Sequence, residues 1–220
     1  MGRTRGAVLF DVDGTLVDST YLHTLAWWRG LTDAGHRLAM ADVHRLIGMG
    51  SSELLTELIG HDDPGLSDAH SRHYQRLKGE LQALPGAREL VAEVARRRGT
   101  VVLATSAKQH DLDDLLRVLD LGDLLDHVVH SADVEHAKPE GDIFARALEA
   151  AGCDASQAMV VGDSPWDVIA AAKVGIDTVA VQTGGHGAAD LLGSGALAVF
   201  RDPVHLLDNF ADSPLGARLA

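Results

Sequence analysis

The sequence predicts an α/β fold: a mainly parallel sheet covered by helices on both faces, with a small all-helical unit inserted after the first strand. Three observations predict it. Short apolar runs alternate with helical stretches over most of the chain. The segment 18–84 contains helical patterns but no convincing strand. The chain has 220 residues, 46% of them apolar, which is enough for one principal core.

The α/β part consists of apolar runs bounded by small and polar residues, with helical stretches between most of them. We expect strands at residues 7–10, 100–104, 127–130, 158–161, 178–181 and 196–200. We expect helices at residues 87–98, 111–119, 141–151 and 165–173. Three arginines followed by Gly99 are typical of a helix C-terminus, where cations oppose the helix dipole. The alternation of strand and helix indicates parallel pairing.

The segment after the first strand has the pattern of several helices, which we expect at residues 19–34, 41–46, 51–59 and 67–81. Pro85 and Gly86 then return the chain to the α/β pattern. The predicted organisation is therefore an α/β core formed by residues 1–17 and 85–220. Residues 18–84, which we call the helical insertion, are expected to form a cap over it.

Composition excludes several classes of protein. The chain has 19 Lys and Arg against 32 Asp and Glu, and its formal net charge of −13 argues against binding nucleic-acid phosphates. Apolar runs fall short of the roughly 18 residues that a membrane-spanning helix needs. Cys153 is the only cysteine, so an internal disulfide is excluded. We expect a cytoplasmic protein, a monomer or weak dimer, that binds neither membrane nor nucleic acid.

Polar residues follow the expected strands where ligands bind in an open parallel sheet, outside the carboxyl ends. They are Asp11, Asp13 and Gly14 after the first strand, Thr105, Ser106 and Lys108 after the second, Lys138 after the third, and Asp163 and Asp167 after the fourth. Each has an ordinary structural explanation by itself: Asp163, for example, could cap the helix that begins near Pro165. Their joint occurrence at strand ends favours a catalytic site.

These residue types suit phosphoryl transfer. Asp11 and Asp163 offer hard oxygen ligands for Mg²⁺, and a carboxylate can also attack phosphorus to form an aspartyl-phosphate. Asp13 could protonate the leaving oxygen and then deprotonate a water molecule. Thr105 and the backbone N–H groups near Gly14 and Ser106 could hold phosphoryl oxygens, whose charge a lysine such as Lys138 would neutralise.

Four motifs give the chain a resemblance to the haloacid dehalogenase superfamily, in the capped subgroup that includes phosphoglycolate phosphatase and β-phosphoglucomutase. They are Phe-Asp-Val-Asp-Gly-Thr-Leu-Val-Asp-Ser at 10–19, Leu-Ala-Thr at 103–105, Lys-Pro at 138–139 and Val-Gly-Asp-Ser-Pro-Trp-Asp at 161–167. The resemblance implies a Rossmann-like core under a helical cap. It makes Asp11 the nucleophile and Asp13 the acid and base. It also assigns phosphate binding to Thr105 and Lys138.

The same resemblance implies a Mg²⁺ site formed by Asp11, the backbone carbonyl of Asp13 and Asp163, with Asp167 in support. It argues against the dehalogenases of the superfamily, which lack the second aspartate of the first motif. It also argues against phosphonoacetaldehyde hydrolase, which needs a cap lysine that residues 48–52 do not supply.

β-Phosphoglucomutase is the alternative that stays open, because it shares the cap and the pattern from His23 to Trp27. Lys108 and Arg76 stand where that enzyme has basic residues. Two departures count against it: Gly162 replaces the usual acidic residue, and Ser51 stands where its cap loop has an arginine.

We therefore predict a Mg²⁺-dependent phosphatase of small phosphorylated metabolites. His23, Met49, Ser51 and Arg76 of the cap are expected to select the substrate, and Lys108 is expected to support the site. A non-catalytic protein that binds phosphorylated ligands is the alternative from another class, which the presence of both Asp11 and Asp13 disfavours.

Overall fold

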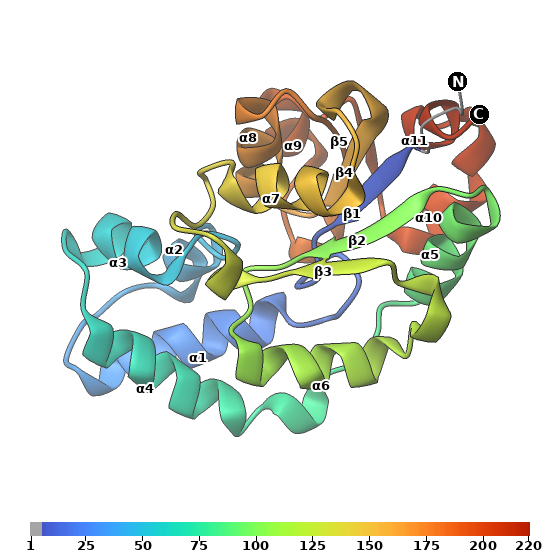
Figure 1. The fold of residues 1–220 in the computed structure, drawn as a ribbon. Coiled ribbons are helices and arrows are strands. Elements are labelled where there is room, and N and C mark those ends of the chain that lie inside the picture. Colours follow the sequence, from blue (N-terminus) through green and yellow to red (C-terminus); the bar gives the residue numbers. More distant parts are fainter. Residues whose placement is uncertain (1–5) are drawn as a thin grey trace.

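A computed structural model describes residues 6–220 and contains a six-stranded parallel sheet in the order β3-β2-β1-β4-β5-β6 (Figure 1). The strands are β1 (Ala7–Phe10), β2 (Thr100–Ala104), β3 (His127–Val129), β4 (Ala158–Gly162), β5 (Asp177–Val181) and β6 (Ala198–Phe200). All neighbouring strands pair in parallel. β1 lies at the centre of the sheet, between β2 and β4, so the later strands are added on both sides of it. The α/β prediction is confirmed.

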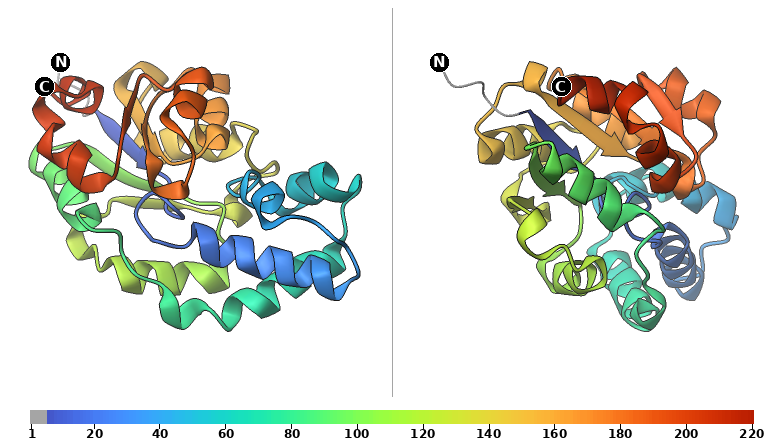
Figure 2. Two further views of the ribbon diagram at one scale, coloured as in Figure 1. Left: turned by 180° about the vertical axis from the view of Figure 1, so that it is seen from behind. Right: turned by 90° about the vertical axis from the view of Figure 1, so that its right-hand side faces the viewer.

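Helices cover both faces of the sheet, and alternate strand residues pack against them (Figure 2). One face carries α5 (Ala87–Arg96), α6 (Gln109–Leu119), α10 (Pro203–Asp208) and α11 (Pro214–Arg218), and the other carries α7 (Asp142–Ala151), α8 (Pro165–Lys173) and α9 (Ala188–Gly193). In β1, Val8 and Phe10 belong to the first face and Leu9 to the second. Burial on both faces explains why the strands are continuous apolar runs.

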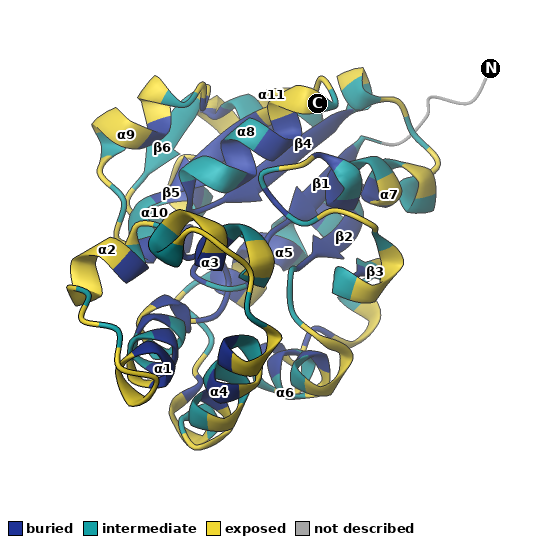
Figure 3. Ribbon diagram, turned by 90° about the vertical axis from the view of Figure 1, so that its left-hand side faces the viewer, coloured by how far each residue is buried: buried dark blue, intermediate teal, exposed yellow. Residues whose placement is uncertain are grey.

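The helical insertion contains α1 (Thr20–Asp33), α2 (Met40–His44), α3 (Ser51–Ile59) and α4 (Pro64–Gln75). α1 and α4 lie side by side, and the insertion lies beyond the carboxyl ends of the central strands (Figures 1 and 3). Its helices share a hydrophobic cluster of their own, with Trp27, Leu31, Leu54, Leu55 and Leu66 among its buried members. The insertion thus covers the edge of the sheet where the motif residues emerge.

The last helix of the insertion differs from the one expected at 67–81. It begins at Pro64 because the Asp63 side chain accepts a hydrogen bond from Gly65 N, and proline suits the first helical position. It ends at Gln75 and is followed by the 3-10 helix Lys78–Glu80. There Lys78 Nζ lies 2.7 Å from Asp111 and 2.8 Å from Asp114 of α6, which ties the returning chain to the core.

Three elements expected in the core are also shorter in the structure than the sequence predicts. The helix expected to end at residue 98 ends at Arg96, because Arg98 has a φ of 62° and the N–H of Gly99 turns back to Val94 O. β3 stops at Val129, since His130 caps the next 3-10 helix. β6 starts at Ala198 rather than at residue 196, because the Ala196 N–H donates to Leu191 O of α9. Among residues 6–220, no helix has the length and apolar character to cross a membrane.

Candidate active site

Residues that follow three strands of the sheet meet at its carboxyl end. Asp11 follows β1, Thr105 follows β2 and Asp163 follows β4, and all three side chains are buried. Lys138, from the loop after β3, reaches the same place and is only 2% exposed. The structure therefore brings together the strand-end residues that the sequence singled out, although they are separated by as many as 152 positions, from 11 to 163.

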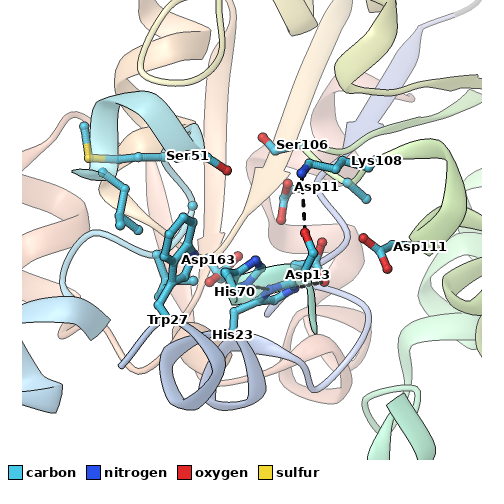
Figure 4. Close-up of a pocket in the computed structure, with 16 residues that line it drawn as sticks. Asp11, Asp13, His23, Trp27, Ser51, His70, Ser106, Lys108, Asp111 and Asp163 are labelled. Carbon is cyan, nitrogen blue, oxygen red and sulfur yellow. Dashed lines mark hydrogen bonds and ion pairs between the residues drawn. The ribbon is translucent and has the colours of Figure 1, made fainter. Parts of the chain in front are cut away.

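A cavity of about 100 Å³ opens above these residues, between the core and the helical insertion (Figure 4). From the core it is lined by Asp11, Asp13, Ser106, Lys108 and Asp163. From the insertion it is lined by His23, Trp27, Met49, Ser51, Leu54 and His70. The core thus contributes the charged groups, whereas the insertion contributes rings, apolar side chains and the hydroxyls of Ser51 and Ser71.

The turn after β1 places its two aspartates by a compact set of backbone hydrogen bonds. The N–H groups of Leu16 and Val17 both donate to Val12 O. Gly14 has a φ of 83°, and a side chain there would collide with Thr20 Oγ1 and the Asp163 carboxylate. The Gly14 N–H donates to Val17 O at 2.8 Å. The turn therefore uses the N–H of Gly14 itself, and the expectation that N–H groups near Gly14 hold phosphate stays a prediction.

Lys138 is paired with two buried carboxylates. Its Nζ lies 2.5 Å from Asp11 Oδ1 and 2.7 Å from Asp167 Oδ1. Burial disfavours the charged amine, but the two carboxylates outweigh burial and raise the pKa of Lys138. Asp167 also accepts hydrogen bonds from the backbone N–H and hydroxyl of Ser164, so it caps α8 and orients the lysine at once. The lysine amine is thereby held as a cation beside the Asp11 carboxylate.

Three buried carboxylates, from Asp11, Asp163 and Asp167, have oxygen atoms within 4.8 Å of one another. Burial raises the pKa of Asp11 to about 7, against the opposing effect of Lys138. Burial also raises the pKa of Asp163 well above its usual value, and the neighbouring carboxylates of Asp167 and Asp11 add to this. One amine does not balance this charge. A cluster of hard oxygen donors that is short of positive charge fits a divalent metal ion.

Asp13 has a different environment from Asp11. Its Oδ1 accepts a hydrogen bond from Ser19 Oγ at 2.6 Å and lies 3.3 Å from His23 Nε2. Burial opposes its charged form, but the hydrogen bonds and charge of His23 and the Ser19 hydroxyl hold the pKa of Asp13 below its usual value. Two aspartates only two positions apart are thus held with pKa values displaced in opposite directions. Such separation is typical of carboxylates with different catalytic roles.

The insertion side of the cavity is built on stacked rings. His70 of α4 stacks on Trp27 at 4.4 Å, and its Nε2 lies 3.2 Å from His23 Nδ1. His23 in turn stacks on Tyr74 at 4.0 Å. His70 was not among the predicted site residues. The available signal was its spacing of four residues from Tyr74, which places both on one face of α4.

The remaining substrate-selecting candidates separate into two groups. Met49 and Ser51 line the cavity, and with Ser106 and Lys108 they also line an adjoining cavity of about 180 Å³. Arg76 does not lie with them: it is exposed, at the C-terminal end of α4, and lines neither of these two cavities. The expectation that Arg76 contacts the substrate is not supported by this geometry.

Comparison with known proteins agrees with this architecture. The profile of the haloacid dehalogenase-like hydrolase family matches residues 8–181, a range that includes every motif described above. The chain belongs to this family. A phosphoglycolate phosphatase from Rhodospirillum rubrum is 30% identical over 224 residues, covering 92% of this chain and 89% of the relative. A phosphorylated carbohydrates phosphatase from Thermotoga maritima is 32% identical over 206 residues, covering 89% and 94%.

Solved structures of the family match nearly the whole chain. A hydrolase from Pseudomonas syringae superposes with a TM-score of 0.89 and 33% identity, covering 94% of this chain and 99% of the other. A protein from Bacteroides vulgatus provisionally named a β-phosphoglucomutase superposes with a TM-score of 0.86 and 25% identity, covering 98% and 90%. A protein named a hydrolase and a protein named after the mutase alternative therefore both have this fold.

Proposed function

We propose that this protein is a Mg²⁺-dependent phosphatase that hydrolyses phosphate monoesters of small metabolites, with Asp11 as nucleophile. The observation that carries the proposal is the position of Asp11. Its carboxylate opens into the cavity, is paired with Lys138 at 2.5 Å, and shares a buried oxygen cluster with Asp163. The phosphatase relatives support the reaction class.

The first step is attack by an Asp11 carboxylate oxygen on phosphorus. The bond between phosphorus and the ester oxygen breaks, and Asp13 gives its proton to that leaving oxygen. Although the pKa of Asp13 is held low in the free protein, an arriving phosphoryl group brings negative charge that favours its protonated form. Ser19 and His23 fix the orientation of the carboxyl group during the transfer.

The second step returns the enzyme to its starting state. Asp13, now ionised, takes a proton from a water molecule, which attacks phosphorus and breaks its bond to Asp11. Lys138, with Thr105 and Ser106, would neutralise and hold the phosphoryl oxygens in both steps. Asp11, the Asp13 carbonyl and Asp163 would hold Mg²⁺, with Asp167 nearby. When bound, the ion supplies positive charge to the phosphoryl group.

The proposal gives the helical insertion the role of a cap. In this role, residues 18–84 cover the carboxyl end of a core formed by residues 6–17 and 85–220, and limit the access of bulk water to the reacting groups; residues 1–5 of the predicted core lie outside the described residues. The two adjoining cavities, of about 100 and 180 Å³, are small beside the roughly 300–1,000 Å³ of sites for drug-sized ligands. This space favours a compact ester such as a sugar phosphate or phosphoglycolate. His23, Met49 and Ser51 would select among such esters.

A mutase would also use Asp11 and Asp13, but it must hold a second phosphoryl group. Ser51 offers a hydroxyl rather than a cation there, and Arg76 lies outside both cavities. An acidic side chain at position 162 has no room, because a Cβ at Gly162 would lie 2.6 Å from Asp167 Cβ. These observations favour hydrolysis over transfer to a second hydroxyl.

The test is a rate survey over sugar phosphates, phosphoglycolate and nitrophenyl phosphate, with Mg²⁺ and with excess chelator. We expect free phosphate from at least one metabolite and its loss on chelation. Full activity in chelator would reject the metal. A separate incubation with β-glucose 1-phosphate and a trace of the bisphosphate addresses the alternative: rapid glucose 6-phosphate formation with little free phosphate would establish a mutase.

A further inference from the structure

The helical insertion touches the core at a second place, outside the cavity. His44, the last residue of α2, lies with its Nε2 2.8 Å from the carbonyl oxygen of Gly184. Its ring stacks on Tyr21 of α1 at 5.0 Å with an interplanar angle of 4°, and on His186 at 5.4 Å and 18°. The hydrogen bond therefore has a defined geometry, because two neighbouring rings hold the imidazole in place.

The core segment that receives this hydrogen bond packs directly against Asp163. Gly184 has no room for a side chain, because a Cβ there would overlap the Asp163 carboxylate. The hydroxyl of the preceding Thr183 donates to Gly14 O. Gly14 also packs against the Asp163 carboxylate and has no room for a side chain. Two backbone segments thus confine Asp163, and His44 contacts one of them.

Gly185, the next residue, shows how closely the insertion is seated on this segment. It has a φ of 85°, and a Cβ there would lie 2.5 Å from the Tyr21 hydroxyl and 2.8 Å from His44 Nε2. Two more hydrogen bonds join the insertion to the core near the site: Trp166 Nε1, in the first turn of α8, donates to Arg45 O at 3.2 Å, and Gly50 N donates to Lys138 O at 3.0 Å. Of these three hydrogen bonds, the one donated by His44 ends on Gly184, the residue whose backbone packs against the Asp163 carboxylate.

We infer that His44 is a positioning residue that couples the seating of the helical insertion to the geometry of the Asp163 carboxylate. The inference rests on the proposed function in assigning Asp163 to the metal. When the insertion is seated, the hydrogen bond from His44 keeps Gly184 against Asp163 and so keeps the carboxylate aimed at the metal position. Coupling of this kind is reciprocal, so metal binding also favours the seated insertion.

The test measures Mg²⁺ binding to the purified full chain by titration calorimetry, without substrate. His44→Phe keeps a ring for the stack but removes the donor, whereas His44→Gln keeps an N–H donor. Because one hydrogen bond contributes modestly, we expect His44→Phe to weaken Mg²⁺ binding by about 3- to 10-fold and His44→Gln to stay within about 2-fold of the wild type. Equal Mg²⁺ affinity in His44→Phe and the wild type would overturn the inference.

His73→Phe is the matched control. His73 also belongs to the insertion and its Nε2 lies 2.8 Å from an Asp33 oxygen, but that pair makes no contact with the core segment at 182–186. We expect unchanged Mg²⁺ affinity in this variant. A merely structural role of His44 would lower Tm in His44→Phe without changing the affinity, which also counts against the inference. If His44→Phe does not fold, His44→Ala removes the donor without the bulk and gives the same readout.

Two further measurements separate this inference from the proposed function. Asp163→Asn should lose Mg²⁺ binding; if it binds Mg²⁺ as the wild type does, the metal site itself is wrongly assigned. If Asp163→Asn loses binding while His44→Phe retains it, only the role of His44 fails. In activity assays, His44→Phe should need more Mg²⁺ for half-maximal rate, whereas kcat at saturating Mg²⁺ should return to within about 2-fold of the wild type.

Discussion

The two ends of the parallel sheet differ in how their charged side chains are buried and paired. At the carboxyl end, Asp11, Asp163, Asp167 and Lys138 are at most 6% exposed. Three carboxylates share one amine there, and burial raises the pKa of two of them. A charge arrangement of this kind opposes folding, since desolvated charges are stabilised only when they are fully paired.

At the amino end, charged side chains stay near the surface and pair with side chains of opposite charge. Glu93 of α5 lies 2.7 Å from both Arg96 and Arg97, and Arg218 lies 2.6 Å from Asp177 at the start of β5. Such pairs lie close to solvent, stabilise the fold a little and leave no carboxylate buried with too little positive charge. We therefore expect charge at the carboxyl end to serve the proposed reaction and charge at the amino end to serve stability, so substitutions at the two ends should have opposite consequences.

The largest effect should come from Asp11→Asn. An amide is a poor nucleophile and cannot form the aspartyl-phosphate, so turnover should fall by at least about 10⁴-fold on every ester while the protein still folds. Steady-state rates and circular dichroism measure the two parts. A folded variant with a near wild-type rate would show that Asp11 is not the nucleophile.

Asp13→Asn should have a smaller effect that depends on the substrate. Loss of a positioned acid and base typically costs about 10²- to 10⁴-fold, and the loss should be greatest for esters with poor leaving groups. Nitrophenyl phosphate, whose leaving group needs little protonation, is the internal control. Equal losses on nitrophenyl and alkyl phosphates would argue that Asp13 is not the proton donor in the first step.

Asp163→Asn should inactivate the enzyme and yet stabilise the metal-free fold. Burial and the neighbouring carboxylates raise the pKa of Asp163 in the folded state, so its ionised form costs stability above the ordinary carboxylate pKa. Removing that charge should increase the free energy of unfolding by about 1–2 kcal/mol at neutral pH in chelator, as measured in urea. The gain should shrink as the pH falls, because the wild-type carboxyl then takes up its proton. A less stable variant would contradict the view that this end of the sheet carries unbalanced charge.

Glu93→Gln should show the smallest effect, opposite in sign and without loss of activity. Hydrogen bonds from Arg96 and Arg97 lower the pKa of Glu93 from 4.5 to about 2. The stabilisation is therefore present above pH 4.5 and is lost as the pH falls toward 2. At pH 7 we expect Tm to fall by about 2 °C, since the pair is near the solvent. Thermal scans from pH 7 to pH 3 should show the two proteins converging; a constant difference would assign the effect to packing.

Much of the core was predictable because parallel strands bring their carboxyl ends to one edge. That single rule places Asp11, Thr105 and Asp163 together from their positions after apolar runs. Contacts between the insertion and the core were not predictable in this way. His70 meets His23 across 47 positions, and His44 meets Gly184 across 140, and neither pair follows a helical or strand period. Arg76, which the sequence assigns to the substrate, lines neither of the two cavities, and its role stays a prediction.

The absence of space at Gly162 constrains how this sequence can change. A Cβ there would lie 2.6 Å from Asp167 Cβ, and Asp167 is itself fixed by its hydrogen bonds to Lys138 and Ser164. Any larger residue at 162 must therefore be accompanied by a shift of the side chain that orients the lysine. The two positions are therefore coupled: an acidic residue at 162 requires that position 167 or its surroundings also change. For directed evolution, libraries that vary the two sites separately would miss every variant in which they have to change together.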